Sequence, residues 1–161
     1  MTRETRFIRV LLVMLLVGLV PASGLLYIVS LDLAAVDPKL VHLRLPIYVA
    51  VLVGFVPVIV AIKAVFDFLG VVDQGEALSA RSVGLLRRLK LIFAIIAAYE
   101  VVGFVGISVA TLVAMGQAKA FMFLGWLAAE IVALFFFALV ALLERLFATA
   151  LKLHQENELT V

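Results

Sequence analysis

Two glutamates, Glu100 and Glu130, stand inside long apolar stretches of the sequence. Each lies about ten residues into its stretch, which at about 1.5 Å per helical residue places both near the middle of a bilayer. An ionisable residue in a membrane span costs several kcal/mol and is rare, and burial disfavours the ionised form of a carboxyl group. We therefore hold two interpretations open. The pair is either a proton relay or a site for a cationic or hydrogen-bonding ligand, or it is two neutral carboxyls that bond within the protein.

A second group of charged residues lies nearer one end of the apolar stretches. Glu144 follows Glu130 by fourteen residues, on nearly the same helical face. Lys63 and Asp67 are four residues apart, a spacing that lets opposite charges pair on one side of a helix. With Arg87 and Arg88 nearby, this inner polar layer is either interfacial charge pairing with snorkelling side chains or a docking surface at a vestibule.

Other reaction chemistries lack the residues they need. The chain has no cysteine, which excludes disulfides, zinc–thiolate sites and iron–sulfur clusters. His42 and His154 are predicted on opposite sides of the membrane, too far apart to share a metal. Neither Ser23 nor Ser108 has a histidine in reach, and no phosphate-binding loop is present. We expect no catalytic residues, no metal and no cofactor, and hence no enzyme.

The elements that carry these residues are apolar and long. Of the 161 residues, 66% are hydrophobic and 15% are charged, with a mean hydropathy of +1.29. A membrane helix needs about 20 mostly apolar residues, and lipid admits only helices or closed barrels. No stretch has the alternation of a barrel strand. The sequence predicts an all-α integral membrane four-helix bundle, one domain over 1–161, with spans at about 7–31, 46–70, 89–115 and 120–143.

Features inside these spans predict their shape and packing. Pro21 and Pro57 lie well within the first and second spans and are expected to kink them. Small residues recur along the third and fourth spans, and only a few residues around Gly116 and Gln117 separate the two. Such stripes let helices approach closely in lipid. The third and fourth spans should therefore form a tight antiparallel hairpin.

The distribution of positive charge predicts the orientation. Lys and Arg gather on the cytoplasmic side of membrane proteins. With the N-terminus inside, ten of the 13 lie on the inner side and three outside, so both termini and the loop from about 71 to 88 are predicted to be cytoplasmic. The net charge of +2 reflects this topology rather than direct nucleic-acid binding. The inner residues are Arg3, Arg6, Arg9, Lys63, Arg81, Arg87, Arg88, Lys90, Arg145 and Lys152, and the outer ones are Lys39, Arg44 and Lys119.

The cytoplasmic loop and tail are the candidates for binding a partner. In the loop, Gly75 suits a turn and Ser79 suits a helix N-cap. The tail, 152–161, reads as solvated, and Leu159 and Val161 alternate as a strand-adding peptide requires. The candidate partner-binding residues of the tail are Glu156, Asn157, Glu158, Leu159, Thr160 and Val161.

These two segments carry a resemblance to a family. The loop with Gly75, Ser79 and the run Arg87-Arg88-Leu89-Lys90 resembles bacterial membrane proteins of the DUF2975 family, and the ending 156–161 is similar to that family's Glu-Asn-Asp-Leu-Thr-Ile. The chain departs at 76–78, where Glu-Ala-Leu stands in place of the family's common Pro-Phe. The resemblance implies a four-span protein without an established activity. Members are often encoded beside small helix-turn-helix regulators of the Cro/C1 type, which implies a transcription regulator as partner.

Three functions remain open at this point. The first is a regulatory or interaction protein of the bacterial inner (plasma) membrane, whose loop and tail bind a soluble partner such as a helix-turn-helix regulator. The second is a small proton-coupled transporter or conduit centred on Glu100 and Glu130, which would need a homo-oligomer to line a pathway. The third is an accessory subunit of a larger membrane complex.

Overall fold

The computed structural model describes residues 3–36, 41–111 and 118–158, and nearly all of them are helical. The four helices are α1 (Arg3–Val36), α2 (Val41–Asp73), α3 (Ala80–Thr111) and α4 (Ala118–Glu158). No strand occurs within the described ranges. The all-α prediction is confirmed, and each helix extends beyond the span predicted for it at one end or both.

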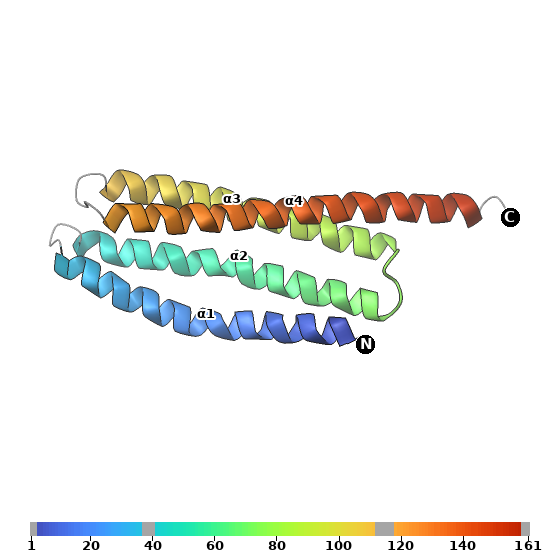
Figure 1. Ribbon diagram of the computed structural model, residues 1–161, viewed down its shortest axis with the longest axis horizontal. Helices are drawn as coiled ribbons and strands as arrows, with labels where there is room; N and C mark the ends of the chain where they lie inside the picture. Colours follow the sequence, from blue (N-terminus) through green and yellow to red (C-terminus); the bar gives the residue numbers. More distant parts are fainter. Residues whose placement is uncertain (1–2, 37–40, 112–117, 159–161) are drawn as a thin grey trace.

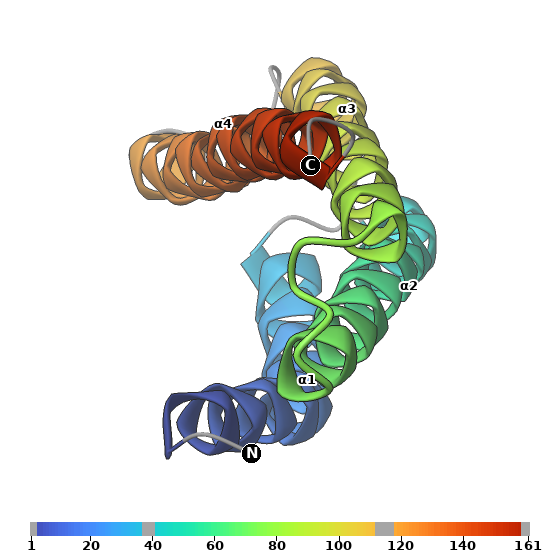
Figure 2. The same cartoon turned by 90° about the vertical axis from the view of Figure 1, so that its right-hand side faces the viewer.

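The helices form an open arc rather than a closed bundle (Figures 1 and 2). Among the described residues, α1 contacts α2, α2 contacts α3 and α3 contacts α4, and no other pair of helices touches. Seen end-on, α1 and α4 lie at the two ends of the arc (Figure 2). The predicted four-helix bundle is therefore wrong in its closure. Apolar faces need not close on one another in lipid, because lipid tails cover them equally well.

Three of the helices contain segments long and apolar enough to cross a membrane: Arg3–Leu25, Tyr48–Asp73 and Leu127–Glu156. Their outward faces are apolar, and large side chains such as Val20 and Leu25 are exposed, which indicates a membrane protein. The third predicted span, 89–115, lies partly outside the described residues. The charged residues in the described part of this span are Lys90 and Glu100.

The core lies along α3, where α2 and α4 pack on its two sides. Its buried members come from these three helices: Ala61, Leu86, Leu89, Ile96, Ala97, Ala133 and Val140. Aromatic pairs extend the contact, with ring centroids 5.4 Å apart in Phe93–Phe136 and 6.0 Å apart in Phe68–Phe147. The predicted pairing of the third and fourth spans is present as the α3–α4 contact. By contrast, none of the described side chains of α1 belongs to this core.

The turn between α2 and α3 follows the sequence prediction closely. Gly75 has φ = 79°, a left-handed conformation that glycine adopts without a Cβ clash. Its N–H donates to the Val72 carbonyl at 3.0 Å. Ser79 caps α3, since its Oγ accepts from the Ser82 N–H at 3.2 Å. The buried Ser82 hydroxyl donates to the Glu76 carbonyl at 2.9 Å, which fastens the loop to the first turn of α3.

Prolines are accommodated inside the helices. Pro21 lies within α1 and Pro46 and Pro57 within α2, and both helices continue through them. Helix α1 is visibly bent along its length (Figure 1), as a proline that removes a backbone hydrogen bond leads us to expect. The bend carries the second half of α1 along α2, where the rings of Tyr27 and Tyr48 meet edge to face at 5.5 Å.

Candidate functional site

One end of the molecule gathers the features that could bind a partner. The start of α1, the loop 74–79 and the end of α4 all lie there, because the four helices run alternately up and down (Figure 1). We call this region the loop end. Helix α4 projects beyond the other three helices at this end (Figure 1).

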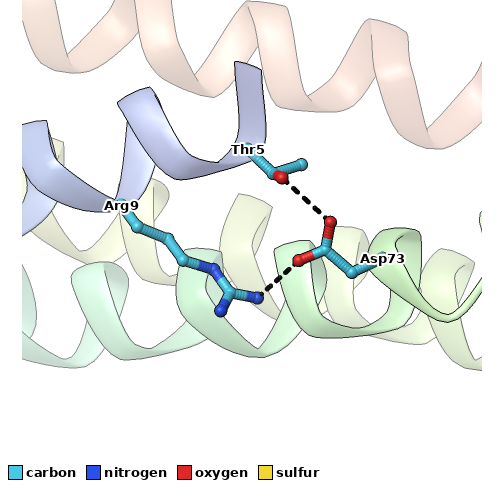
Figure 3. Close-up of polar contacts among 3 residues, drawn as sticks. All are labelled: Thr5, Arg9 and Asp73. Atoms are coloured by element: carbon cyan, nitrogen blue, oxygen red, sulfur yellow. Dashed lines mark hydrogen bonds and ion pairs between the residues drawn. The ribbon is translucent and has the colours of Figure 1, made fainter. Parts of the chain in front are cut away.

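A polar cluster at the loop end joins α1 to the last residue of α2 (Figure 3). The Thr5 hydroxyl donates to Asp73 Oδ1 at 2.9 Å, and the Arg9 guanidinium donates to Asp73 Oδ2 at 2.9 Å. The side chains of Arg9 and Asp73 are only 30% and 11% exposed. We call these three residues the α1–α2 clasp. Thr5 is the only residue classed as buried in the part of α1 whose side chains the structure describes.

Sequence reasoning missed the clasp, although one signal for it existed. Arg9 and Asp73 are 64 residues apart, so no local spacing rule connects them. They stand, however, near the first residue of one helix and at the last residue of the next. An antiparallel hairpin brings these two positions to the same level, and an isolated charge there requires a partner.

A second ionic contact at the loop end joins α3 to α4. Glu144 is 14% exposed and forms an ion pair with Lys90, and the Arg87 Nε lies 3.7 Å from its other oxygen. Arg87 itself is largely exposed, so this longer contact adds little. Glu144 is thus a structural tie between the two helices that carry the glutamate pair, and Arg87 belongs to it rather than to a layer with Lys63 and Asp67.

Lys63 and Asp67 do not behave as the four-residue spacing suggests. Both side chains are exposed on α2, and within the described residues no ion pair joins them. Each charge is accessible from outside the protein, and a surface pair of this type gains little from staying together. They line no enclosed polar layer.

Glu100 and Glu130 face each other across the α3–α4 contact. Their side chains interact directly, and one carboxyl oxygen of each is shielded from solvent. Two carboxyls so placed can share a proton or hold a cation between them. Immediately beside Glu100, the Tyr99 hydroxyl donates to the Ala50 carbonyl of α2, so the pair stands next to the α2–α3 contact as well.

The C-terminal segment is helical as far as Glu158, and its side chains from 152 to 156 are exposed. Helix α4 continues to Glu158, and Lys152 and Glu156 lie 3.7 Å apart as an i,i+4 pair with both side chains exposed. Leu159, Thr160 and Val161 lie outside the described residues, and so does the strand-like alternation predicted there. Of the side chains of Asn157 and Glu158 nothing is described.

Comparison with known proteins identifies a family without assigning an activity. The model of DUF2975, described as a protein of unknown function, matches residues 28–161. The match includes Asp73, the loop, the glutamate pair and α4, whereas Thr5 and Arg9 precede it. No curated protein and no solved structure matches the chain.

Proposed function

The chain belongs to the DUF2975 family, whose function is unknown, and from this premise we propose that it is a multi-pass protein of the bacterial inner membrane that holds a soluble regulator at the cytoplasmic face. In this proposal all four helices span the bilayer, and the loop end with both termini is cytoplasmic. The proposal of orientation rests on the ten Lys and Arg residues predicted on that side.

The observation that carries the proposal is the projecting end of α4. At about 1.5 Å per residue a helix of 41 residues is about 60 Å long, about twice the ~30 Å of a bilayer's hydrocarbon core. Since α4 continues past α2 and α3 (Figure 1), its last turns leave the membrane as a helical stalk, which we define as residues 152–158.

The stalk and the turns directly before it carry two exposed leucines on one face of α4. Leu146 and Leu153 are 56% and 57% exposed. They are seven residues apart and therefore lie on one face. Lys152, Gln155 and Glu156 flank Leu153 with polar groups. A helix with spaced apolar anchors is a common ligand for the groove of a soluble protein.

The loop 74–79 offers a second exposed apolar group at the same end. Leu78 is about half exposed and is the one large apolar side chain of the loop 74–79. The bonds of Gly75, Ser79 and Ser82 hold the loop in one shape, so binding it costs little ordering entropy. The partner we propose is a helix-turn-helix regulator, and contact with DNA is made by that partner and not by this chain.

Affinity purification from gently solubilised native membranes tests the proposal. Tagged full-length chain is compared with a chain that ends at Gln155, with Leu153→Ala, and with Gln155→Ala as matched control on another face of the stalk. A DNA-binding protein that is recovered with full-length chain and the control, and lost with the other two, supports the proposal. Recovery of the same proteins with all four refutes it. Circular dichroism and gel filtration verify that each variant is folded.

A second function is favoured by the contact between Glu100 and Glu130. We propose as the alternative a proton-coupled conduit that uses this pair within an oligomer. The test is ion and proton flux into vesicles that contain the purified protein, with both glutamates changed to glutamine. Flux that is equal in wild type and the double variant refutes the alternative.

A further inference from the structure

We propose that the α1–α2 clasp is a releasable fastening, through which the position of α1 in the membrane controls the shape of the loop 74–79. The inference rests on the proposed function of that loop as part of the partner-binding end, and adds to it an input. The clasp would then be the point where a change among the membrane helices reaches the cytoplasmic surface.

Helix α1 is attached to the protein differently from the other three helices. Among the side chains that the structure describes, the core cluster and the residues packed around it come from α2, α3 and α4. Within its described side chains α1 buries Thr5 and exposes large apolar residues such as Phe7, Met14 and Val20. Because lipid covers these side chains as well as protein would, the hydrophobic effect does not hold α1 against α2, and the attachment comes from close packing together with specific polar contacts.

The clasp supplies such contacts at the loop end. Thr5 and Arg9 are one helical turn apart, and each donates to a different oxygen of Asp73. Half-opening the clasp is unfavourable, since Asp73 is 11% exposed and would keep a shielded charge with too few donors. Full opening restores hydration or headgroup contacts to both charges. The clasp therefore favours two states, closed and open, over a continuum.

The closed clasp holds Asp73, the residue directly before the loop 74–79, in place. Asp73 ends α2, and the loop bonds begin beside it, with the Glu76 N–H donating to the Val71 carbonyl at 3.2 Å. The Glu76 carbonyl in turn accepts from Ser82, which is fully buried in α3. A displaced Asp73 must move the start of this short bonded segment while Ser82 stays in place. Release of α1 is thus transmitted to the loop over a few residues.

Spin labels can follow the clasp, because the chain has no cysteine of its own. The full chain in vesicles of phosphatidylglycerol and phosphatidylethanolamine carries labels at Glu4→Cys on α1 and Gln74→Cys in the loop, both exposed positions. Pulsed electron resonance gives the distribution of distances between them. We compare the otherwise unchanged chain with Asp73→Asn, with Arg9→Gln, and with the reversed pair Arg9→Asp plus Asp73→Arg.

Matched controls remove the same charges where no clasp exists. Asp67→Asn lies on α2 and Arg6→Gln lies on α1, and both side chains are exposed and outside the clasp. Loss of a hydrogen bond to a charged group changes an equilibrium about tenfold to hundredfold. We expect Asp73→Asn and Arg9→Gln to raise the ratio of a long-distance state to the closed state by about that factor. The reversed pair should return it toward the unmodified value, and the controls should leave it unchanged.

Identical distributions in Asp73→Asn, Asp67→Asn and the unmodified chain would refute the clasp. If Asp73→Asn does not yield a folded protein, Thr5→Val is used to test the clasp. That variant keeps every charge and removes one of the two bonds to Asp73, and it should raise the long-distance state above that of the controls. An unchanged distribution in Thr5→Val would then refute the clasp.

Transmission to the loop has its own measurement. A single label at Leu78→Cys reports the mobility of the exposed loop position. We expect a change of mobility in Asp73→Asn and none in Asp67→Asn. Movement of α1 without a change at position 78 would overturn the coupling. No partner is needed for either measurement, so failure of the partner-binding proposal in affinity purification is seen separately from failure of the clasp.

Discussion

The contact between Gly54 and Tyr99 offers a sharp test of how α2 and α3 pack. A Cβ atom added at Gly54 would lie 2.9 Å from Cε1 and 3.5 Å from Cδ1 of the Tyr99 ring. The ring cannot move aside without loss, because its hydroxyl donates to the Ala50 carbonyl one turn earlier in α2. Gly54→Ala should therefore destabilise the protein although alanine favours helix.

The magnitude follows from two opposing effects. Overpacking a close contact costs about 1–3 kcal/mol, while Gly→Ala in a helix gains up to about 1 kcal/mol. At Gly70, also on α2, an added Cβ meets nothing within 4 Å. Gly70→Ala thus keeps the helix gain without the clash. Most of the helix effect cancels when the free energies of unfolding of the two variants are subtracted. The remaining difference should be about 1–3 kcal/mol, with Gly54→Ala the less stable.

Reversible unfolding of the purified protein in mixed micelles, with increasing SDS, measures these free energies. Combining Gly54→Ala with Tyr99→Ala provides a double-variant cycle. In the absence of the ring, Gly54→Ala should not lower the free energy of unfolding. Equal stability of Gly54→Ala and Gly70→Ala would refute the close approach of α2 and α3 at this level. A cost of Gly54→Ala that persists in the Tyr99→Ala background would refute the assignment to the ring.

Other contacts give further expectations that the same unfolding measurement checks. Ser79→Ala should destabilise by about 1 kcal/mol through loss of the α3 N-cap, and Ser79→Asp should restore it; equal stability of the three would argue against the cap. Gly75→Ala should cost about 1 kcal/mol because its φ is positive, and Gly75→Asn should cost less; the reverse order would contradict this. Glu144→Gln should cost about 1–2 kcal/mol by leaving Lys90 without its carboxylate, and Lys90→Gln in the Glu144→Gln background should then cost little; additive losses would disprove the pairing.

Local features of the chain were predictable where a short-range rule applies. Gly75 and Ser79 were assigned to a turn and a cap from residue type alone, and the structure places them so. The direct contact of Glu100 with Glu130 followed from their equal depth and from the short connection between their helices. In each case the relevant partner lies within a few residues or across one tight hairpin.

Other features could not be predicted from residue spacing or hydropathy. The spacing of Lys63 and Asp67 suggested an ion pair, yet both remain exposed, because an i,i+4 spacing permits a pair without requiring it. The ending was predicted as a solvated tail, and its side chains from 152 to 156 are exposed, but its helical conformation up to Glu158 was not predicted. The open arc was missed for a different reason. Hydropathy identifies which helices are apolar but not which of them contact one another.

The sequence by itself determined that the chain is helical and apolar, that its positive charge gathers at one end, and where its main turn lies. These follow from composition, period and single-residue preference. Only the tertiary structure decided that, in the described parts of the chain, each helix contacts its sequence neighbours alone, and that Asp73 receives hydrogen bonds from Thr5 and Arg9 of α1. The physical reason is that in lipid the apolar surface gives little direction to assembly. Close packing and a few polar contacts, made between residues far apart in sequence, therefore fix how the helices meet.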